Sequence, residues 1–145
     1  MARYIDSSLV LSILLEEEMK NEAAAIWKED PLRVSSFLLP AEGYIVLRRY
    51  YTTYSGRLPP DWLPKKEKKL KTLLEETALS ALNDQLIEII DVKKEIARCR
   101  TLDAVHLATA INFQEKIYPE KLTLCTFDQT MKRIAKRLGF TVLPR

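Results

Sequence analysis

Short apolar segments alternate with longer helical segments along this chain, and this alternation restricts its possible folds more than any other feature. The segments with the character of a strand are residues 3–5, 32–35, 85–90, 122–127 and 141–143. Because the segments between them are long enough to form helices, we expect crossover connections rather than tight hairpins. The pattern predicts an α/β fold, with a central, mostly parallel sheet between two helical layers in a three-layer α/β/α arrangement.

The helical segments are marked by apolar periodicity and by start and stop residues. We predict helices over residues 22–27, 40–54, 92–98, 102–114 and 129–138, and another after Asp6 that is capped by Ser7 or Ser8. Thr101 is expected to cap the helix at 102–114, and Gly139 to follow the last helix. After a loop at 57–64, a long basic helix is expected, with an apolar stripe that runs from Leu70 to Leu82.

The chain has 145 residues, which is enough for one domain with a hydrophobic core. No linker divides it, so we expect a single domain over residues 1–145. Asp30 and Pro31 are expected to introduce the second strand. No apolar segment approaches the ~20 residues that span a bilayer, and no signal peptide is recognisable. The two cysteines, Cys99 and Cys125, are typical of a reducing compartment, and we therefore expect a cytoplasmic protein without a membrane partner.

Composition excludes several classes of site. Three glycines are too few for a glycine-rich phosphate loop. One histidine and two cysteines exclude a zinc finger, a multi-histidine metal site and a disulfide framework. The formal net charge of +3 permits a nucleic-acid partner without requiring one. Much of the basic charge lies near the Lys65–Lys71 cluster, which is either a solvated helix surface or a surface that follows an RNA backbone.

Four carboxylates stand where a solvated surface residue is not expected. Asp6 and Asp128 each end a predicted strand, and the carboxyl ends of parallel strands meet at one edge of the sheet, where ligands bind. Glu42 interrupts an apolar helical face, and Asp103 lies on the apolar stripe that continues through Ala110. A half-buried carboxylate is costly unless it is paired or binds a cation.

Each carboxylate also has an ordinary structural interpretation. Asp6 and Asp128 precede helices that they could cap, the helix dipole favours Asp103 near a helix start, and Glu42 could pair with Arg49. Considered together, the four are harder to explain in this way. If they converge, they repel one another and need a cation, and an all-oxygen site suits Mg²⁺ or Mn²⁺.

The sequence also resembles a known family. The segment at 102–110, LDAVHLATA, resembles a signature of PIN-domain nucleases. Thr126, Phe127 and Asp128, followed by a helix, are similar to the last motif of these nucleases, and the segment at 4–8, YIDSS, is similar to their first. Glu42 falls in the expected third helix, and the resemblance covers residues 4–143.

The resemblance implies an Mg²⁺- or Mn²⁺-dependent endoribonuclease, and within the family a VapC-type toxin of a type II toxin–antitoxin pair. Asp6, Glu42, Asp103 and Asp128 would then be the catalytic and metal-binding residues. The implied partners are RNA, a small antitoxin protein and a second copy of the chain. Arg49 and Arg100 are candidates for binding substrate phosphates, or only for pairing with the carboxylates.

Two other interpretations remain at this point. The chain could be a PIN nuclease of RNA processing outside toxin–antitoxin systems, or a non-catalytic binding scaffold, including a receiver-like domain that uses a single Asp. His106 could act as a catalytic base, but a single histidine on an apolar stripe is more often a buried structural residue, and we favour that interpretation.

Overall fold

The computed structural model describes residues 1–29 and 31–145 and forms an α/β fold. Asp30 lies outside the described residues, so its predicted place before the second strand is not tested. The strands are β1 (Ala2–Ile5), β2 (Leu32–Ser36), β3 (Thr77–Ser80), β4 (Leu122–Cys125) and β5 (Thr141–Leu143). The α-helices are α1 (Ser7–Leu14), α2 (Lys20–Lys28), α3 (Leu38–Tyr54), α4 (Trp62–Glu75), α5 (Asp84–Val92), α6 (Thr101–Ile117) and α7 (Gln129–Arg137). Two short 3₁₀ helices, η1 (Ser55–Arg57) and η2 (Lys94–Arg98), complete the elements.

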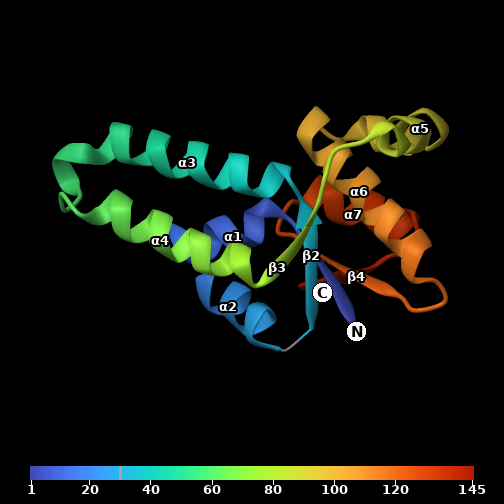
Figure 1. The fold of residues 1–145 in the computed structure, drawn as a ribbon, viewed down its shortest axis with the longest axis horizontal. Coiled ribbons are helices and arrows are strands. Elements are labelled where there is room, and N and C mark those ends of the chain that lie inside the picture. The colour runs from blue at the N-terminus through green and yellow to red at the C-terminus, as the bar shows by residue number, and fades with distance from the viewer. Residues whose placement is uncertain (30) are drawn as a thin grey trace.

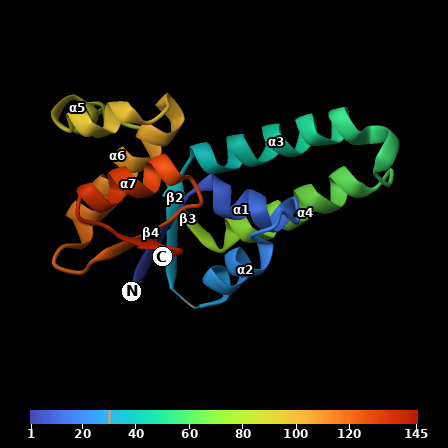
Figure 2. The same cartoon turned by 180° about the vertical axis from the view of Figure 1, so that it is seen from behind.

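The five strands form one sheet in the order β3-β2-β1-β4-β5, and every neighbouring pair is parallel. Helices α1–α4 lie on one side of the sheet and α5–α7 on the other, as the two opposite views show (Figure 1, Figure 2). The three-layer arrangement predicted from the alternating pattern is therefore confirmed. Because all strands point the same way, the residues that follow β1 and β4 emerge side by side, and the Asp6 amide donates to the Cys125 carbonyl at 3.0 Å.

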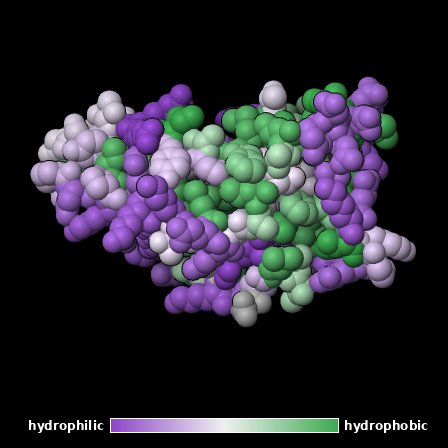
Figure 3. All heavy atoms as spheres, in the orientation of Figure 1, coloured by the Kyte–Doolittle hydropathy of each residue, from purple (hydrophilic) through white to green (hydrophobic). Residues whose placement is uncertain are grey.

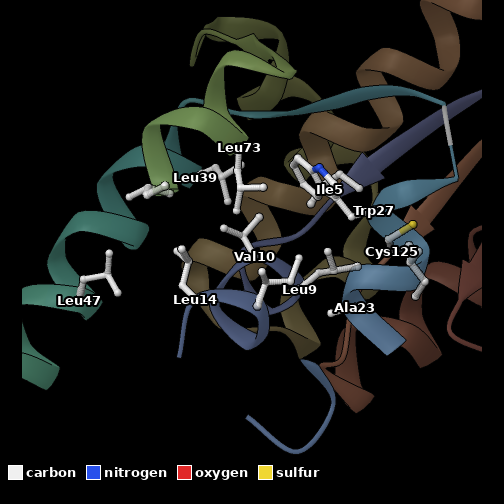
Figure 4. Close-up of a cluster of buried hydrophobic side chains, with 13 residues drawn as sticks. Ile5, Leu9, Val10, Leu14, Ala23, Trp27, Leu39, Leu47, Leu73 and Cys125 are labelled. Atoms are coloured by element: carbon white, nitrogen blue, oxygen red, sulfur yellow. The ribbon is translucent and has the colours of Figure 1, made fainter. Parts of the chain in front are cut away.

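The two faces of β1 contribute to separate parts of the core. Ile5 packs with Leu9, Val10 and other side chains of α1–α4 in the cluster that Figure 4 draws. Tyr4, on the opposite face, packs with Leu107 and the other buried side chains of α6 and α7. Because successive strand residues face opposite sides, a continuous apolar strand is stable only when both faces are covered by helices.

Helices α3 and α4 form a hairpin that extends away from the sheet (Figure 1). Near its far end Tyr50 and Tyr51 stack on Trp62, with ring centroids 5.2 and 6.2 Å apart. Arg48 donates to Glu67 across the two helices at 3.0 Å. Packing within the hairpin therefore accounts for the aromatic side chains of this region.

The Lys65–Lys71 cluster lies on α4, on a surface where hydrophilic side chains predominate (Figure 3). Lys65 pairs with Asp61 at 2.7 Å, and Lys66 lies 3.9 Å from Glu16. Two of its cations are thus compensated locally, which fits the solvated-surface interpretation better than a continuous nucleic-acid surface.

The structure corrects two predicted elements. Residues 85–90 form part of helix α5 rather than a strand. The Asn83 side chain accepts from the Gln85 amide at 3.0 Å and so starts a helix. The predicted long basic helix ends at Glu75, and the next residues form β3, which pairs with β2. The apolar residues between 77 and 82 happen to continue the apolar stripe of the preceding helix. Their conformation is determined instead by the pairing of β3 with β2.

Helix boundaries were predicted less well than the helices themselves. Helix α4 begins at Trp62, inside the predicted loop, because Pro64 lies in the first turn, where a missing amide donor costs nothing. Asp6, not Ser7 or Ser8, is the N-cap of α1, and Arg100 rather than Thr101 precedes α6 without a side-chain cap. Gly139 follows α7 with φ of +90°, as the sequence predicts.

Gly43 allows α3 and α4 to pack closely, and its substitution is expected to destabilise the hairpin. A Cβ at this position would lie 2.9 Å from Leu70 Cδ2, and Leu70 is completely buried. We expect Gly43→Val to lower the free energy of unfolding by about 1–3 kcal/mol, as overpacking does. Gly56→Val is the matched control, since nothing lies within 4 Å of a Cβ there. Urea denaturation measures both, and equal stability of the two variants would contradict this packing.

In the part of the chain that the structure describes, no helix has the combination of length and apolar character that crossing a bilayer requires.

Candidate active site

The four predicted carboxylates come from separate elements that meet at the carboxyl edge of the sheet. Asp6 directly follows β1, and Asp128 follows β4 after two further residues. Glu42 lies in the second turn of α3, and Asp103 in the first turn of α6. We call these four residues the acidic site.

Repulsion between the carboxylates of the acidic site affects the pKa of Asp103. Burial raises the pKa of Asp103, and the negative charges of Asp6, Asp128 and Glu42 raise it further, whereas His106 opposes them. The other three carboxylates are thus close enough to Asp103 for their charges to raise its pKa. Such a group favours a bound cation, because a cation removes the repulsion.

Asp6 is the most enclosed of the four, with 2% of its surface exposed. Its Oδ2 accepts hydrogen bonds from Ser8 Oγ and Thr126 Oγ1, both at 2.7 Å. Its Oδ1 is buried and has no hydrogen-bond partner. One oxygen is therefore fixed by neighbouring hydroxyls, and the other is an unsatisfied acceptor in a site rich in negative charge.

Two hydroxyl side chains hold the strand ends together around Asp6. The Phe127 amide donates to Ser8 Oγ at 2.9 Å, and the Asp128 amide donates to Thr126 Oγ1 at 3.1 Å. The segment after β4 is thereby tied to the start of α1. Asp128 caps α7, since its Oδ1 accepts from the Met131 amide at 2.7 Å. The capping interpretation of Asp128 is correct, yet capping engages only one of its two oxygens.

Glu42 belongs to a buried hydrogen-bonded chain. His106 Nε2 lies 2.6 Å from Glu42 Oε1, and His106 Nδ1 lies 2.7 Å from the Tyr4 hydroxyl. Ser7 Oγ donates to the other carboxylate oxygen at 3.1 Å. Because a carboxylate only accepts, Nε2 carries the proton that faces Glu42. His106 is completely buried and orients Glu42, in agreement with a structural role.

The ionisation of this chain follows from its surroundings. Burial, together with the negative charge of Asp6, raises the pKa of Tyr4, so its hydroxyl stays protonated. Burial lowers the pKa of His106, but the hydrogen bond with Glu42 and the charges of Asp6, Glu42 and Asp103 outweigh it, and the net shift is upward. Tyr4 and Ser8 are the parts of the site that sequence reasoning missed, because their side chains look like ordinary strand and helix residues.

Replacing Tyr4 with Phe removes one end of the chain without changing the ring. We expect Tyr4→Phe to lower the free energy of unfolding by about 1–3 kcal/mol, because His106 Nδ1 loses a buried partner. Tyr118→Phe, at a side chain that is 80% exposed, is the control and should have no effect. Denaturant unfolding of both variants checks this, and an unchanged Tyr4→Phe would show that the hydroxyl is not needed.

The acidic site lacks basic counter-charges among the described residues. No Lys or Arg side chain there forms a salt bridge with any of its four carboxylates, and the basic side chain that contacts them is the His106 imidazole. Arg49, expected as a partner of Glu42, is exposed on α3, and Arg100 is exposed just before α6. Neither arginine neutralises a carboxylate of the acidic site. The substrate-binding role suggested for them stays a prediction.

The oxygen ligands of the acidic site are of the type that binds a divalent cation, but their side chains are not arranged to coordinate one. As the side chains lie, no group of three or more His, Cys, Asp or Glu within residues 1–29 and 31–145 could hold a metal ion. Glu42 is engaged by His106 and Asp128 by its capping bond. The unsatisfied Asp6 Oδ1 and the all-oxygen donors are nevertheless what Mg²⁺ or Mn²⁺ requires.

The fold and the site together define the class: a parallel α/β domain with acidic residues at the carboxyl edge of its sheet. The sequence model of the PIN domain matches residues 3–137, which is nearly the whole chain. The chain belongs to the PIN domain family, and PIN domains are nucleases. No curated protein matches the sequence.

Solved structures with the same fold include three toxin–antitoxin complexes. A toxin–antitoxin complex from Klebsiella pneumoniae is 15% identical, with 99% of this chain and 98% of that chain covered and a TM-score of 0.66. VapBC2 from Rickettsia felis, bound to a DNA fragment from its promoter, is 14% identical, with 98% and 97% covered and a TM-score of 0.63. VapBC-1 from nontypeable Haemophilus influenzae is 13% identical, with 98% and 96% covered and a TM-score of 0.61. At these identities the likeness establishes the fold.

Proposed function

We propose that this protein is an endoribonuclease that depends on Mg²⁺ or Mn²⁺ and hydrolyses RNA phosphodiester bonds. The observation that carries the proposal is the acidic site itself. Four carboxylates from four parts of the chain lie at one edge of the sheet, and the charges of three of them raise the pKa of Asp103. Within the described residues no lysine or arginine pairs with them, so a bound cation is the neutralising partner that their chemistry favours.

The acidic site and the side chains that support it divide the work in this proposal. The carboxylates of the acidic site would hold the metal ion, which when bound would supply Lewis-acid stabilisation of the phosphoryl oxygens and activate water. Ser8 and Thr126 hold Asp6 in place, and His106 holds Glu42, so the carboxylates keep their positions when substrate binds. One of the carboxylates orients the attacking water and accepts its proton.

The proposed biological role is that of the toxin of a toxin–antitoxin pair in the cytoplasm. The neighbours named above are toxin–antitoxin complexes, and their chains align with this one over nearly their full length. We therefore propose a small antitoxin protein and a second copy of the chain as partners. Both cysteines are free thiols, which agrees with a reducing compartment.

Purified protein and defined RNA test the enzymatic proposal. Incubation with Mg²⁺ should produce RNA fragments, and EDTA should prevent their formation. Asp6→Asn should remove the activity, whereas Asp91→Asn, at an exposed carboxylate of α5, should leave it unchanged. A folded protein without metal-dependent cleavage, or an Asp6→Asn variant as active as the parent, would contradict the proposal.

Expression in cells tests the toxin role separately. Growth arrest on induction, relieved by co-expression of a small neighbouring gene, would support the toxin–antitoxin assignment. Active enzyme that leaves growth unchanged would favour a nuclease of RNA processing instead.

A further inference from the structure

A second charged feature lies beside the acidic site, on the surface formed by η2 and α7. A pocket of about 240 Å³ is lined by Arg98 of η2 and by Thr130, Arg133, Ile134 and Arg137 of α7. Ile134 is buried beneath it, and the three arginines are exposed. We call this feature the arginine pocket.

Three arginines line this pocket, and no carboxylate that the structure describes lines it with them. In the described parts of the chain none of these arginines forms a salt bridge, and Arg133 Nη2 donates a hydrogen bond to Thr130 Oγ1 at 3.4 Å. Helix spacing explains why two of the arginines line the same pocket, because Arg133 and Arg137 are four residues apart and share one face of α7. Gathering like charges is unfavourable unless they bind an anion.

The arginine pocket adjoins the acidic site. Thr130 lies two residues after Asp128, the N-cap of α7. On the other wall, Cys99 directly follows Arg98, and burial together with the charges of Asp103 and Asp128 raises the pKa of Cys99 to about 11. One wall of the pocket thus begins two residues from Asp128, and the other is joined to a residue on which the charges of Asp103 and Asp128 act. From Thr130 the pocket extends two helical turns along α7, about 10 Å.

We propose that the arginine pocket binds a phosphodiester group of the RNA that flanks the cleaved bond; this rests on the nuclease function proposed above. Guanidinium groups offer paired donors that match phosphate oxygens, and Thr130 adds a hydroxyl. An acidic site repels a polyanion, so an RNA strand needs a cationic anchor next to it. A pocket that begins two residues from Asp128 supplies this anchor.

RNA binding without cleavage tests the proposal. Fluorescence anisotropy of a labelled single-stranded RNA is measured in EDTA at several salt concentrations, for the parent and for Arg98→Gln/Arg133→Gln/Arg137→Gln. We expect the triple variant to bind at least about tenfold more weakly, with the slope of log K against log salt reduced by about 0.7, as loss of one phosphate contact on a single strand predicts. The matched control is Lys28→Gln/Lys116→Gln/Lys121→Gln, which removes three exposed cations from the opposite end of the strands and should bind like the parent.

A triple variant with lysine in place of the three arginines controls for misfolding. It keeps the positive charges but loses the paired donors of the guanidinium groups. Its affinity should fall between those of the parent and the glutamine variant. Unchanged RNA binding by a folded glutamine variant overturns the proposal, even if the parent cleaves RNA. The proposal is also overturned if the glutamine variant still binds RNA but no longer binds an acidic peptide. Weakened RNA binding by the variant supports the pocket even if the parent proves unable to cleave, and only the nuclease function would then fail.

Discussion

Asp103→Asn is expected to lower RNA cleavage by at least about a hundredfold, since it removes one of the negative charges that would hold the metal ion in the proposed site. The same variant should be at least as stable as the parent when no metal is present. Ionised Asp103 is repelled by Asp6, Asp128 and Glu42, and this repulsion is part of what raises its pKa. Loss of activity without loss of stability is typical of functional residues and not of structural ones.

Single-turnover cleavage and thermal unfolding in EDTA measure these two effects. Glu115→Gln is the matched control, because Glu115 is an exposed carboxylate on the same helix, α6. It should change neither quantity. A less stable Asp103→Asn variant with the activity of the parent would show that Asp103 has a structural role only.

His106→Ala is expected to have the largest effect on stability. It removes the link between Glu42 and Tyr4, which leaves a half-buried carboxylate and a buried hydroxyl without their partner. The lost hydrogen bonds and the cavity left by the imidazole together cost about 3–5 kcal/mol. Because His106 positions Glu42, activity measured where the variant is still folded should also fall, by about 10–100-fold.

A positioning role has a specific signature. The Mg²⁺ concentration that gives half-maximal cleavage should rise in His106→Ala, because Glu42 is no longer oriented. Leu107→Ala is the control: Leu107 is also completely buried on α6, so its truncation should destabilise without shifting the Mg²⁺ dependence. If both variants need the same Mg²⁺ concentration for half-maximal cleavage, His106 contributes only to packing and does not position Glu42.

The edge of the sheet could be predicted from the sequence because it depends on local signals. A buried strand followed by an aspartate occurs at both Asp6 and Asp128, and a parallel sheet brings such residues together. Glu42 and Asp103 stood out because each interrupts an apolar helical face. Residues 85–90 were assigned to a strand because Leu86, Ile87, Ile89 and Ile90 form a short apolar segment, which periodicity alone does not distinguish from a helix.

The features that sequence analysis missed depend on distant residues. Tyr4 and His106 are 102 positions apart, and nothing local shows that they share a hydrogen bond. Arg98 is separated from Arg133 by a whole helix and a strand, so no local pattern indicates that they line one pocket. Sequence reasoning looked for basic charge around Lys65–Lys71 instead, where Asp61 and Glu16 compensate two of the lysines.

Direct titration of Mn²⁺ into the protein, followed by calorimetry, tests the central claim that the acidic site binds a divalent cation. The account predicts saturable binding to the parent and affinity reduced by at least about tenfold in both Asp6→Asn and Asp103→Asn. A folded parent that binds no Mn²⁺, or variants that bind it as tightly as the parent, would contradict the account.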